Sequence, residues 1–444
     1  MFCNVFSVHN FNNNGSPTII SVSNYNLVKQ HSSLYRVKQL SFIDHDKDNR
    51  LVGLFLIMGI FGVEPAPQKY EMLHNYYITR LNGGIINKPL KINCHKTVKD
   101  IASSLVSCMP NVTRLKLESA TEDDVMVDFL AEIAFLYRRN MQKFECLVEG
   151  YLPQLHDAEK LKHIDMSLCN WEFIPGQSIY PSSLKYLRMR SINVKFDWSI
   201  FSSATQPHNA CFDQLRSLNL HGDIREYSKR MFNEEITLAL EFPALEFLTI
   251  RYIRLTPKHI KSIMLGPLNQ LEFSGYSFDA LCFVKHKHTR LKKLTLNFER
   301  GLEHDDAKFV TNSNFIFSNT SKIANVNCNI VWRSVWFDFS NIRWKHVTHL
   351  GVHASFEFYD LLRAVRGMTR LTSLVISMVH LEESSIERAV KRVEEEKGTG
   401  LARIPCKVKT VVLDYGNGYH NVINLRADRQ DWFSMAEAIF SLSV

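Results

Sequence analysis

The sequence predicts an α/β solenoid with parallel strands on its concave face and helices and irregular segments on its convex face. Three observations support this prediction. A short apolar pattern recurs along most of the chain, it recurs at intervals of a few tens of residues, and helix-forming signals lie between several of its copies. A pattern that repeats at such a period is typical of stacked repeats rather than of a compact globular domain.

The repeated pattern is L-x-x-L-x-L, with other apolar residues allowed at each position. Its copies are Val37-Leu40-Phe42, Val112-Leu115-Leu117, Met141-Phe144-Cys146, Leu161-Ile164-Met166, Leu184-Leu187-Met189, Leu215-Leu218-Leu220, Leu245-Leu248-Ile250, Leu268-Leu271-Phe273, Leu291-Leu294-Leu296, Ile323-Val326-Cys328, Val347-Leu350-Val352, Leu371-Leu374-Ile376 and Val408-Val411-Leu413. From position 112 onward, successive copies start 20 to 37 residues apart. Leucine-rich repeats have periods of about 20–29 residues, and the longer intervals leave room for loop insertions.

The pattern has a direct physical meaning. Its second and third apolar residues are two positions apart, so they share one side of a short strand. The first apolar residue turns in beneath the same strand. One such unit cannot bury its apolar set alone, whereas stacked units can.

Helical signals lie between several copies of the pattern. We expect helices after Thr121, after the pair Thr256-Pro257, over Phe358–Arg366 ending at Gly367, and over Leu381–Lys397. A terminal helix over about residues 428–442 is expected to close the last repeat. The predicted organisation is therefore a poorly defined polar segment over residues 1–30, and then a solenoid over residues 31–444 with irregular N-terminal repeats and a C-terminal capping helix.

Bulk composition fits a folded protein with a modest positive charge. Of the 444 residues, 45% are hydrophobic and 22% are charged, and the formal net charge is +8. The nine cysteines include no CxxC pair, and the N-terminus lacks the pattern of a signal peptide, so we expect reduced thiols in a cytoplasmic or nuclear protein. The longest apolar run, residues 51–63, is shorter than the roughly 20 residues of a membrane span.

The repeats resemble those of irregular fungal leucine-rich-repeat proteins of the F-box type. The segments that carry this resemblance are PSSLKYLRM at 181–189, FDQLRSLNL at 212–220, FPALEFLTI at 242–250 and MTRLTSLVI at 368–376. The resemblance covers about residues 100–420 and implies protein binding, with a role as substrate-recognition subunit of a ubiquitin ligase. The sequence departs from the family in two ways. Among the turn positions where the regular motif has Asn or Cys, only Cys169 fits well, and no F-box is detected.

A partner is expected on the concave face, which strand alternation gives to the residues between the apolar positions. The candidate binding residues are Arg114, Lys116, His163, Tyr186, Arg188, Arg190, His221, Phe247, Arg251 and Lys293. Arginine and aromatic residues are common interface anchors, and a basic groove suits a protein partner with an acidic or phosphorylated segment. The alternative interpretation is that these residues only keep the strand face soluble.

Other function classes have weaker support in the sequence. Asp44, Asp46 and Asp48 imitate the start of a calcium loop, but the glycine and the final glutamate of such a loop are missing. The pair His286 and His288, and the set Cys94, His95 and Cys108, have too few ligands for zinc. Known catalytic motifs are missing from the sequence, so we expect a binding protein without a metal or cofactor and not an enzyme. A basic scaffold associated with nucleic acid is the alternative function, and a hydrolase is a third.

Overall fold

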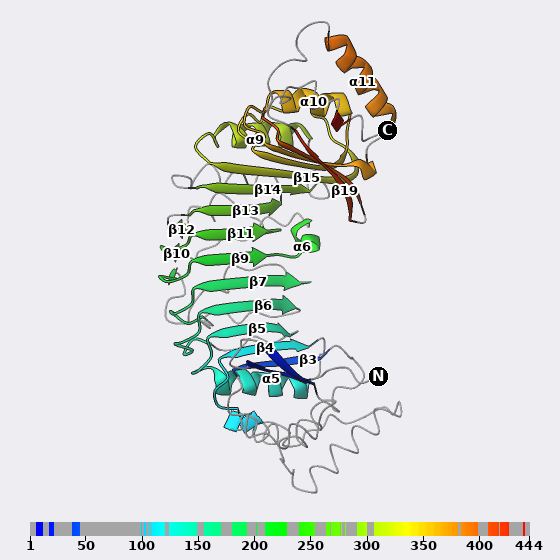
Figure 1. Ribbon diagram of the computed structural model, residues 1–444. Coiled ribbons are helices and arrows are strands. Elements are labelled where there is room, and N and C mark those ends of the chain that lie inside the picture. Colours follow the sequence, from blue (N-terminus) through cyan, green and yellow to red (C-terminus); the bar gives the residue numbers. More distant parts are fainter. Residues whose placement is uncertain are drawn as a thin grey trace, which may run out of the picture. The chain divides into compact units, whose positions relative to one another are not determined.

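A computed structural model gives the fold of the chain (Figure 1). It describes residues 6–11, 17–21, 38–44, 109–119, 124–148, 155–169, 180–192, 209–228, 239–253, 263–266, 268–275, 291–299, 306–380, 383–397, 407–416 and 418–425, and a few isolated residues elsewhere. The chain divides into two compact units, the first comprising Met1–Leu218 and Thr237–Phe242, the second Asn219–Ile236 and Pro243–Val444. The predicted α/β class with mostly parallel strands is confirmed in both units.

The first unit contains a sheet whose strands follow the chain order from β3 onward, with an antiparallel pair before them. The strands are β1 (Phe6–Phe11), β2 (Pro17–Ser21), β3 (Gln39–Asp44), β4 (Arg114–Ser119), β5 (Lys143–Val148), β6 (His163–Cys169) and β7 (Tyr186–Ile192). Strands β3 to β7 run parallel to one another. Helix α5 (Asp124–Tyr137) connects β4 to β5, and two short strands, β8 (Asn209–Cys211) and β10 (Ala239–Phe242), form a separate parallel pair.

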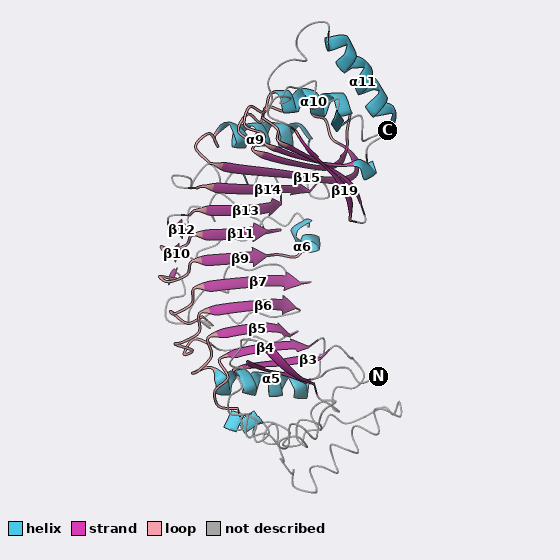
Figure 2. Ribbon diagram, viewed as in Figure 1, coloured by secondary structure: helices cyan, strands magenta, loops and turns pink. Residues whose placement is uncertain are grey.

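The second unit repeats this arrangement. Its main sheet contains β11 (Phe247–Arg251), β13 (Gln270–Gly275), β14 (Lys293–Glu299), β15 (Asn325–Trp336), β16 (His349–Ser355), β17 (Ser373–Ser377), β18 (Thr410–Gly416) and β19 (Tyr419–Asn424). All neighbours in this list pair in parallel except β18 and β19, which form an antiparallel hairpin. The other elements are α6 (Ile224–Ser228), β12 (Ile263–Leu265), α9 (Asp306–Ser318), α10 (Phe358–Arg366), the 3-10 turn Met378–His380 and α11 (Glu383–Lys397), which Figure 2 shows in colour by type. Strand β9 (Ser217–His221) contains the boundary between the two units.

The apolar triplets occupy the positions that the sequence predicts. From Val112-Leu115-Leu117 to Val408-Val411-Leu413, every member of every triplet is at most 7% exposed. In the first unit Leu115, Phe144, Ile164 and Leu187 are successive register partners. In the second unit Leu248, Leu271, Leu294 and Val326 are successive partners. Each strand therefore covers the apolar side chains of the next, as expected for units that cannot bury them alone.

One change of register interrupts this regular pairing. Between β15 and β16, Cys328 pairs with Leu350, so the third apolar residue of one repeat lies opposite the second of the next. An offset of two residues keeps the same side chains inward, whereas an offset of one would turn them all to the other face. The core therefore continues through the offset, and Val352 and Ile376 stay fully buried.

A cluster of aromatic side chains fills the core beside this offset. Strand β15 is long and has an irregularity between Trp332 and Trp336. The Trp332 ring packs edge-on against Phe337 at 4.6 Å between centroids and tilts against Phe309 of α9 at 5.1 Å. The buried Trp344 indole donates a hydrogen bond to Ser313 of α9 at 3.2 Å. Large rings therefore anchor α9 where the repeat is least regular.

Helices α5, α10 and α11 agree with expected helices, whereas α9 and the short α6 are not predicted from the sequence. Helix α10 begins at Phe358 and ends at Arg366, with Gly367 as its C-cap. The acidic Glu357 before it is paired with Arg388 of α11 at 2.9 Å, and Arg366 and Tyr359 of α10 both bond to Glu396 of α11. These contacts hold the two helices together.

Several expectations lie at the ends of the chain or outside the described residues. Within the expected polar segment 1–30, the structure contains the antiparallel strands β1 and β2. The helix expected after Thr256-Pro257 and the apolar run 51–63 lie outside the described residues. So does most of the expected terminal helix, of which only Ala438 and Ile439 are described, both helical. Within the described residues, no helix is long and apolar enough to cross a membrane.

A matched pair of substitutions tests the burial of the apolar triplets. Val326 is fully buried in β15, while Val422 in β19 is 51% exposed. Val326→Ala is expected to lower the free energy of unfolding by about 2 kcal/mol, because it removes buried methyl groups and leaves a cavity. Val422→Ala is expected to change it by less than about 0.5 kcal/mol. Urea unfolding followed by circular dichroism measures both, and equal losses would contradict the buried column.

Candidate strand-face binding site

The outward face, meaning the side of the strands opposite the apolar triplets, carries the candidate binding residues. In the first unit these residues come from β4, β6 and β7: Arg114, Lys116, His163, Tyr186, Arg188 and Arg190. All six are at least partly exposed. The outward face of this unit therefore has the cations and the aromatic residue that the sequence predicts.

Carboxylates neutralise several of these cations. Lys116 is paired with Glu118 at 2.7 Å, and Arg188 with Asp165 of the neighbouring strand at 3.4 Å. A further pair joins Lys143 to Glu145 at 2.5 Å. The sequence reasoning did not single out Lys143 and Glu145, although the triplet Met141-Phe144-Cys146 gives them the outward positions of β5 by the same rule. The face is therefore less basic than a count of its Arg and Lys residues suggests.

His163 lies in the middle of this arrangement. Its ring is tilted against that of Tyr186, with 5.9 Å between centroids, and Tyr186 is 45% exposed. Burial lowers the pKa of His163, and the charge of Lys143 lowers it further, while Asp165 and Glu145 act in the opposite direction. His163 therefore favours the neutral form more than a histidine in water does.

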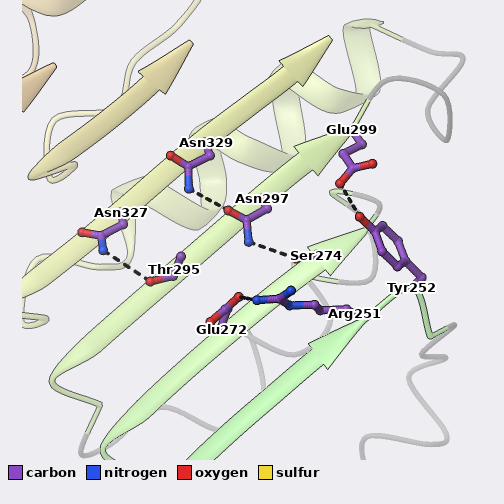
Figure 3. Close-up of polar contacts among 9 residues, drawn as sticks. All are labelled: Arg251, Tyr252, Glu272, Ser274, Thr295, Asn297, Glu299, Asn327 and Asn329. Carbon is purple, nitrogen blue, oxygen red and sulfur yellow. Dashed lines mark hydrogen bonds and ion pairs between the residues drawn. The ribbon is translucent and has the colours of Figure 1, made fainter. Parts of the chain in front are cut away.

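The second unit holds the other four candidates, His221, Phe247, Arg251 and Lys293. Phe247 at the start of β11 is 44% exposed. Arg251 at the end of β11 forms an ion pair at 2.5 Å with Glu272 of β13 (Figure 3). Since Arg251 is opposite Ser274 and Thr249 is opposite Glu272, this pair runs diagonally between the two strands.

A ladder of uncharged polar side chains continues across the next strands. Asn329 of β15 donates to Asn297 of β14 at 2.7 Å, and Asn297 donates to Ser274 of β13 at 3.0 Å. In the next row, Asn327 donates to Thr295 at 3.4 Å (Figure 3). We call these residues (Ser274, Thr295, Asn297, Asn327 and Asn329) the amide ladder.

Two oxygen atoms of the amide ladder have distinctive surroundings. The Oδ1 atom of Asn327 is buried and has no hydrogen-bond partner among the described residues. The Oδ1 atom of Asn329 lies over Gly351 of β16, so close that a Cβ at this glycine would be only 2.5 Å from it. A side chain at position 351 would therefore displace the Asn329 amide, and the glycine leaves room for this amide where the ladder meets β16. Asn327 and Asn329 are not among the binding residues predicted from the sequence, although the triplet Ile323-Val326-Cys328 places them outward.

Tyr252, the residue after β11, lies where the strands of this surface end. Tyr252 has a φ of 53°, a left-handed conformation that is uncommon for residues other than glycine. Its hydroxyl donates to Glu299 at the end of β14, and its ring lies 5.4 Å from that of His221. Burial and the bond to Glu299 raise the pKa of Tyr252 well above its ordinary value. Tyr252 therefore stays a neutral donor at physiological pH.

The remaining candidates add no chemistry to the described structure. Asp46, Asp48, His286, His288, Cys94, His95 and Cys108 all lie outside the described residues. Among the residues that are described, no group of three or more His, Cys, Asp or Glu side chains could hold a metal ion. The ten predicted binding residues separate into six in the first unit and four in the second, and each unit brings its own set together on one face.

No protein-family model matches the chain, and no curated protein matches its sequence.

The lowered pKa of His163 makes the stability of the protein depend on pH. The unfolded chain binds a proton near pH ~6.5, whereas the folded chain does so only at lower pH. The contribution of neutral His163 to stability is therefore fully present above about pH 6.5. It is lost as the pH decreases toward the pKa of His163 in the folded chain. His163→Gln is expected to reduce the loss of melting temperature between about pH 7.5 and 5.5, and the exposed His420→Gln is the control. An unchanged pH dependence in His163→Gln would contradict the burial of this ring.

Proposed function

We propose that the chain is a leucine-rich-repeat solenoid that binds a protein along the outward face of its strands. The repeat assignment is supported by the inward triplets, their pairing in register and their spacing of 20 to 37 residues. The resemblance to F-box proteins adds a role in a ubiquitin ligase as a further prediction. Recovery of a ligase adaptor with the protein from its native cell would support that role.

The observation that carries the binding proposal is the amide ladder. Its side chains are uncharged and can both donate and accept hydrogen bonds, which matches the alternating N–H and C=O groups of a peptide backbone. They stand on neighbouring strands, so they are held rigidly and lose little entropy on binding. The exposed Phe247 stands in the same unit on the same face, and aromatic residues are frequent anchors of protein interfaces. This surface suits an extended segment of a protein.

The ladder is less suited to a phosphorylated segment or to nucleic acid, the other ligands that the sequence allows. Arg251, which lies opposite Ser274 at the edge of the ladder, is already paired with Glu272. A phosphate group bound there would have to compete with this carboxylate for the guanidinium. An extended peptide requires no such exchange, because its own groups supply both donors and acceptors.

Removal of two amides tests the proposal. The double variant Asn297→Ala with Asn327→Ala is expected to weaken partner binding about tenfold, since each hydrogen bond contributes about 0.5–1.5 kcal/mol. The matched control is Asn341→Ala, an exposed asparagine away from the strands whose side chain bonds, among the described residues, to Ser340 alone. Quantitative affinity capture with the full chain identifies the retained proteins, and titration then measures their affinity. The proposal fails if the double variant and the control retain the same partners equally well.

A further inference from the structure

A column of polar and basic residues borders the sheet of the first unit. Each member directly precedes a strand, and its backbone N–H donates to the carbonyl of the previous member at 2.7 to 2.9 Å. In order, the column is Lys38, Thr113, Gln142, Lys162, Lys185 and Arg216. It contains no acidic residue. Neighbouring strands are about 4.8 Å apart, so the last three cations follow one another at this interval.

The last three cations have no carboxylate partner in the described part of the chain. Lys162, Lys185 and Arg216 have no ion pair or side-chain hydrogen bond with any described residue, and Lys162 and Arg216 are exposed. The outward face beside them differs, because Lys116, Lys143 and Arg188 each have an acidic partner. Three of the five lysines and arginines on the outward face (Arg114, Lys116, Lys143, Arg188 and Arg190) therefore have an acidic partner, whereas none of the last three cations of the border column has one among the described residues.

An exposed aromatic residue adjoins this column. Tyr186 follows Lys185 in the chain, is 45% exposed, and has its ring supported by that of His163. A row of cations beside an exposed ring matches the way proteins hold single-stranded nucleic acid, where cations follow the phosphates and bases stack on aromatic rings. An acidic peptide would use the cations but would gain little from the ring. The combination therefore favours nucleic acid.

We propose that the first unit binds single-stranded nucleic acid. Lys162, Lys185 and Arg216 contact the phosphate backbone, and one base stacks on Tyr186. This function is separate from the binding of protein by the amide ladder, which belongs to the other unit.

The first experiment measures binding of a labelled oligothymidylate of about 20 nucleotides to the full chain by fluorescence anisotropy. Three phosphate contacts on a single strand predict that the logarithm of the binding constant falls with the logarithm of salt concentration with a slope of about −2. The exposed double variant Lys162→Glu with Arg216→Glu, and the triple variant that adds Lys185→Glu, are expected to lose at least tenfold in affinity and most of this slope. The double variant is the reference if the triple variant does not fold.

The matched control has the same change in charge at exposed positions of the second unit, Lys322→Glu, Arg343→Glu and Lys391→Glu. It is expected to retain binding to within about twofold. Equal losses in the two triple variants would show that net charge alone attracts the oligonucleotide, and this would overturn the proposal. Absence of binding by the unchanged protein at low salt would do the same.

A second experiment separates nucleic acid from an acidic peptide. Tyr186→Ala is expected to weaken oligothymidylate binding about tenfold, while Tyr186→Phe keeps it, because stacking needs only the ring. Polyglutamate of equal charge should compete poorly. If polyglutamate competes as well as the oligonucleotide and Tyr186→Ala has no effect, the ligand is an acidic chain and the proposal is wrong. Asn297→Ala with Asn327→Ala should leave oligonucleotide binding unchanged, so failure of the protein-binding proposal is detected separately.

Discussion

The burial of three apolar side chains per repeat is the constraint on which the rest of this structure depends. Each such side chain contributes about 1.5–3 kcal/mol when it leaves water, but a single strand cannot cover its own set. Strands therefore pair in parallel with the apolar positions aligned, as Leu271, Leu294 and Val326 do. The same alignment fixes which side chains remain outside and which of them become neighbours. The packing of the core therefore determines which side chains are neighbours on the outward face.

This dependence explains what could be predicted from the sequence. The triplets identify the strands and their inward sides, because period and spacing are properties of the chain itself. Alternation then places residues such as Tyr186 and Phe247 outward, and both are exposed in the structure. Helix α10 was predictable at both ends, since Gly367 ends the apolar pattern that begins at Phe358.

The chemistry of the face was less predictable, because it depends on pairing between strands. The ion pair of Arg188 with Asp165 and the bond of Asn329 to Asn297 require the register of two repeats. The offset between β15 and β16 places Gly351 beside Asn329, and no spacing in the sequence indicates it. The border column is also missed by alternation, because its members lie in the turn before each strand rather than within it.

The two units contain the same apolar triplet pattern but present different surfaces. In the first, most cations of the outward face are paired with carboxylates, while cations without an acidic partner among the described residues line its border. In the second, an uncharged amide ladder runs across β13, β14 and β15. Contacts to phosphates depend strongly on salt, whereas hydrogen bonds between neutral groups depend on it only weakly. The two proposed activities are therefore separable in solution by ionic strength.

A double-mutant cycle in the second unit measures the alignment of the apolar column most directly. Leu294 and Val326 are register partners, while Leu413 lies on β18, several strands from Leu294. If each strand covers the next, Leu294→Ala and Val326→Ala should couple by at least about 0.5 kcal/mol in the free energy of unfolding, and Leu294→Ala with Leu413→Ala should be additive. Additivity in both pairs would contradict the stacked column.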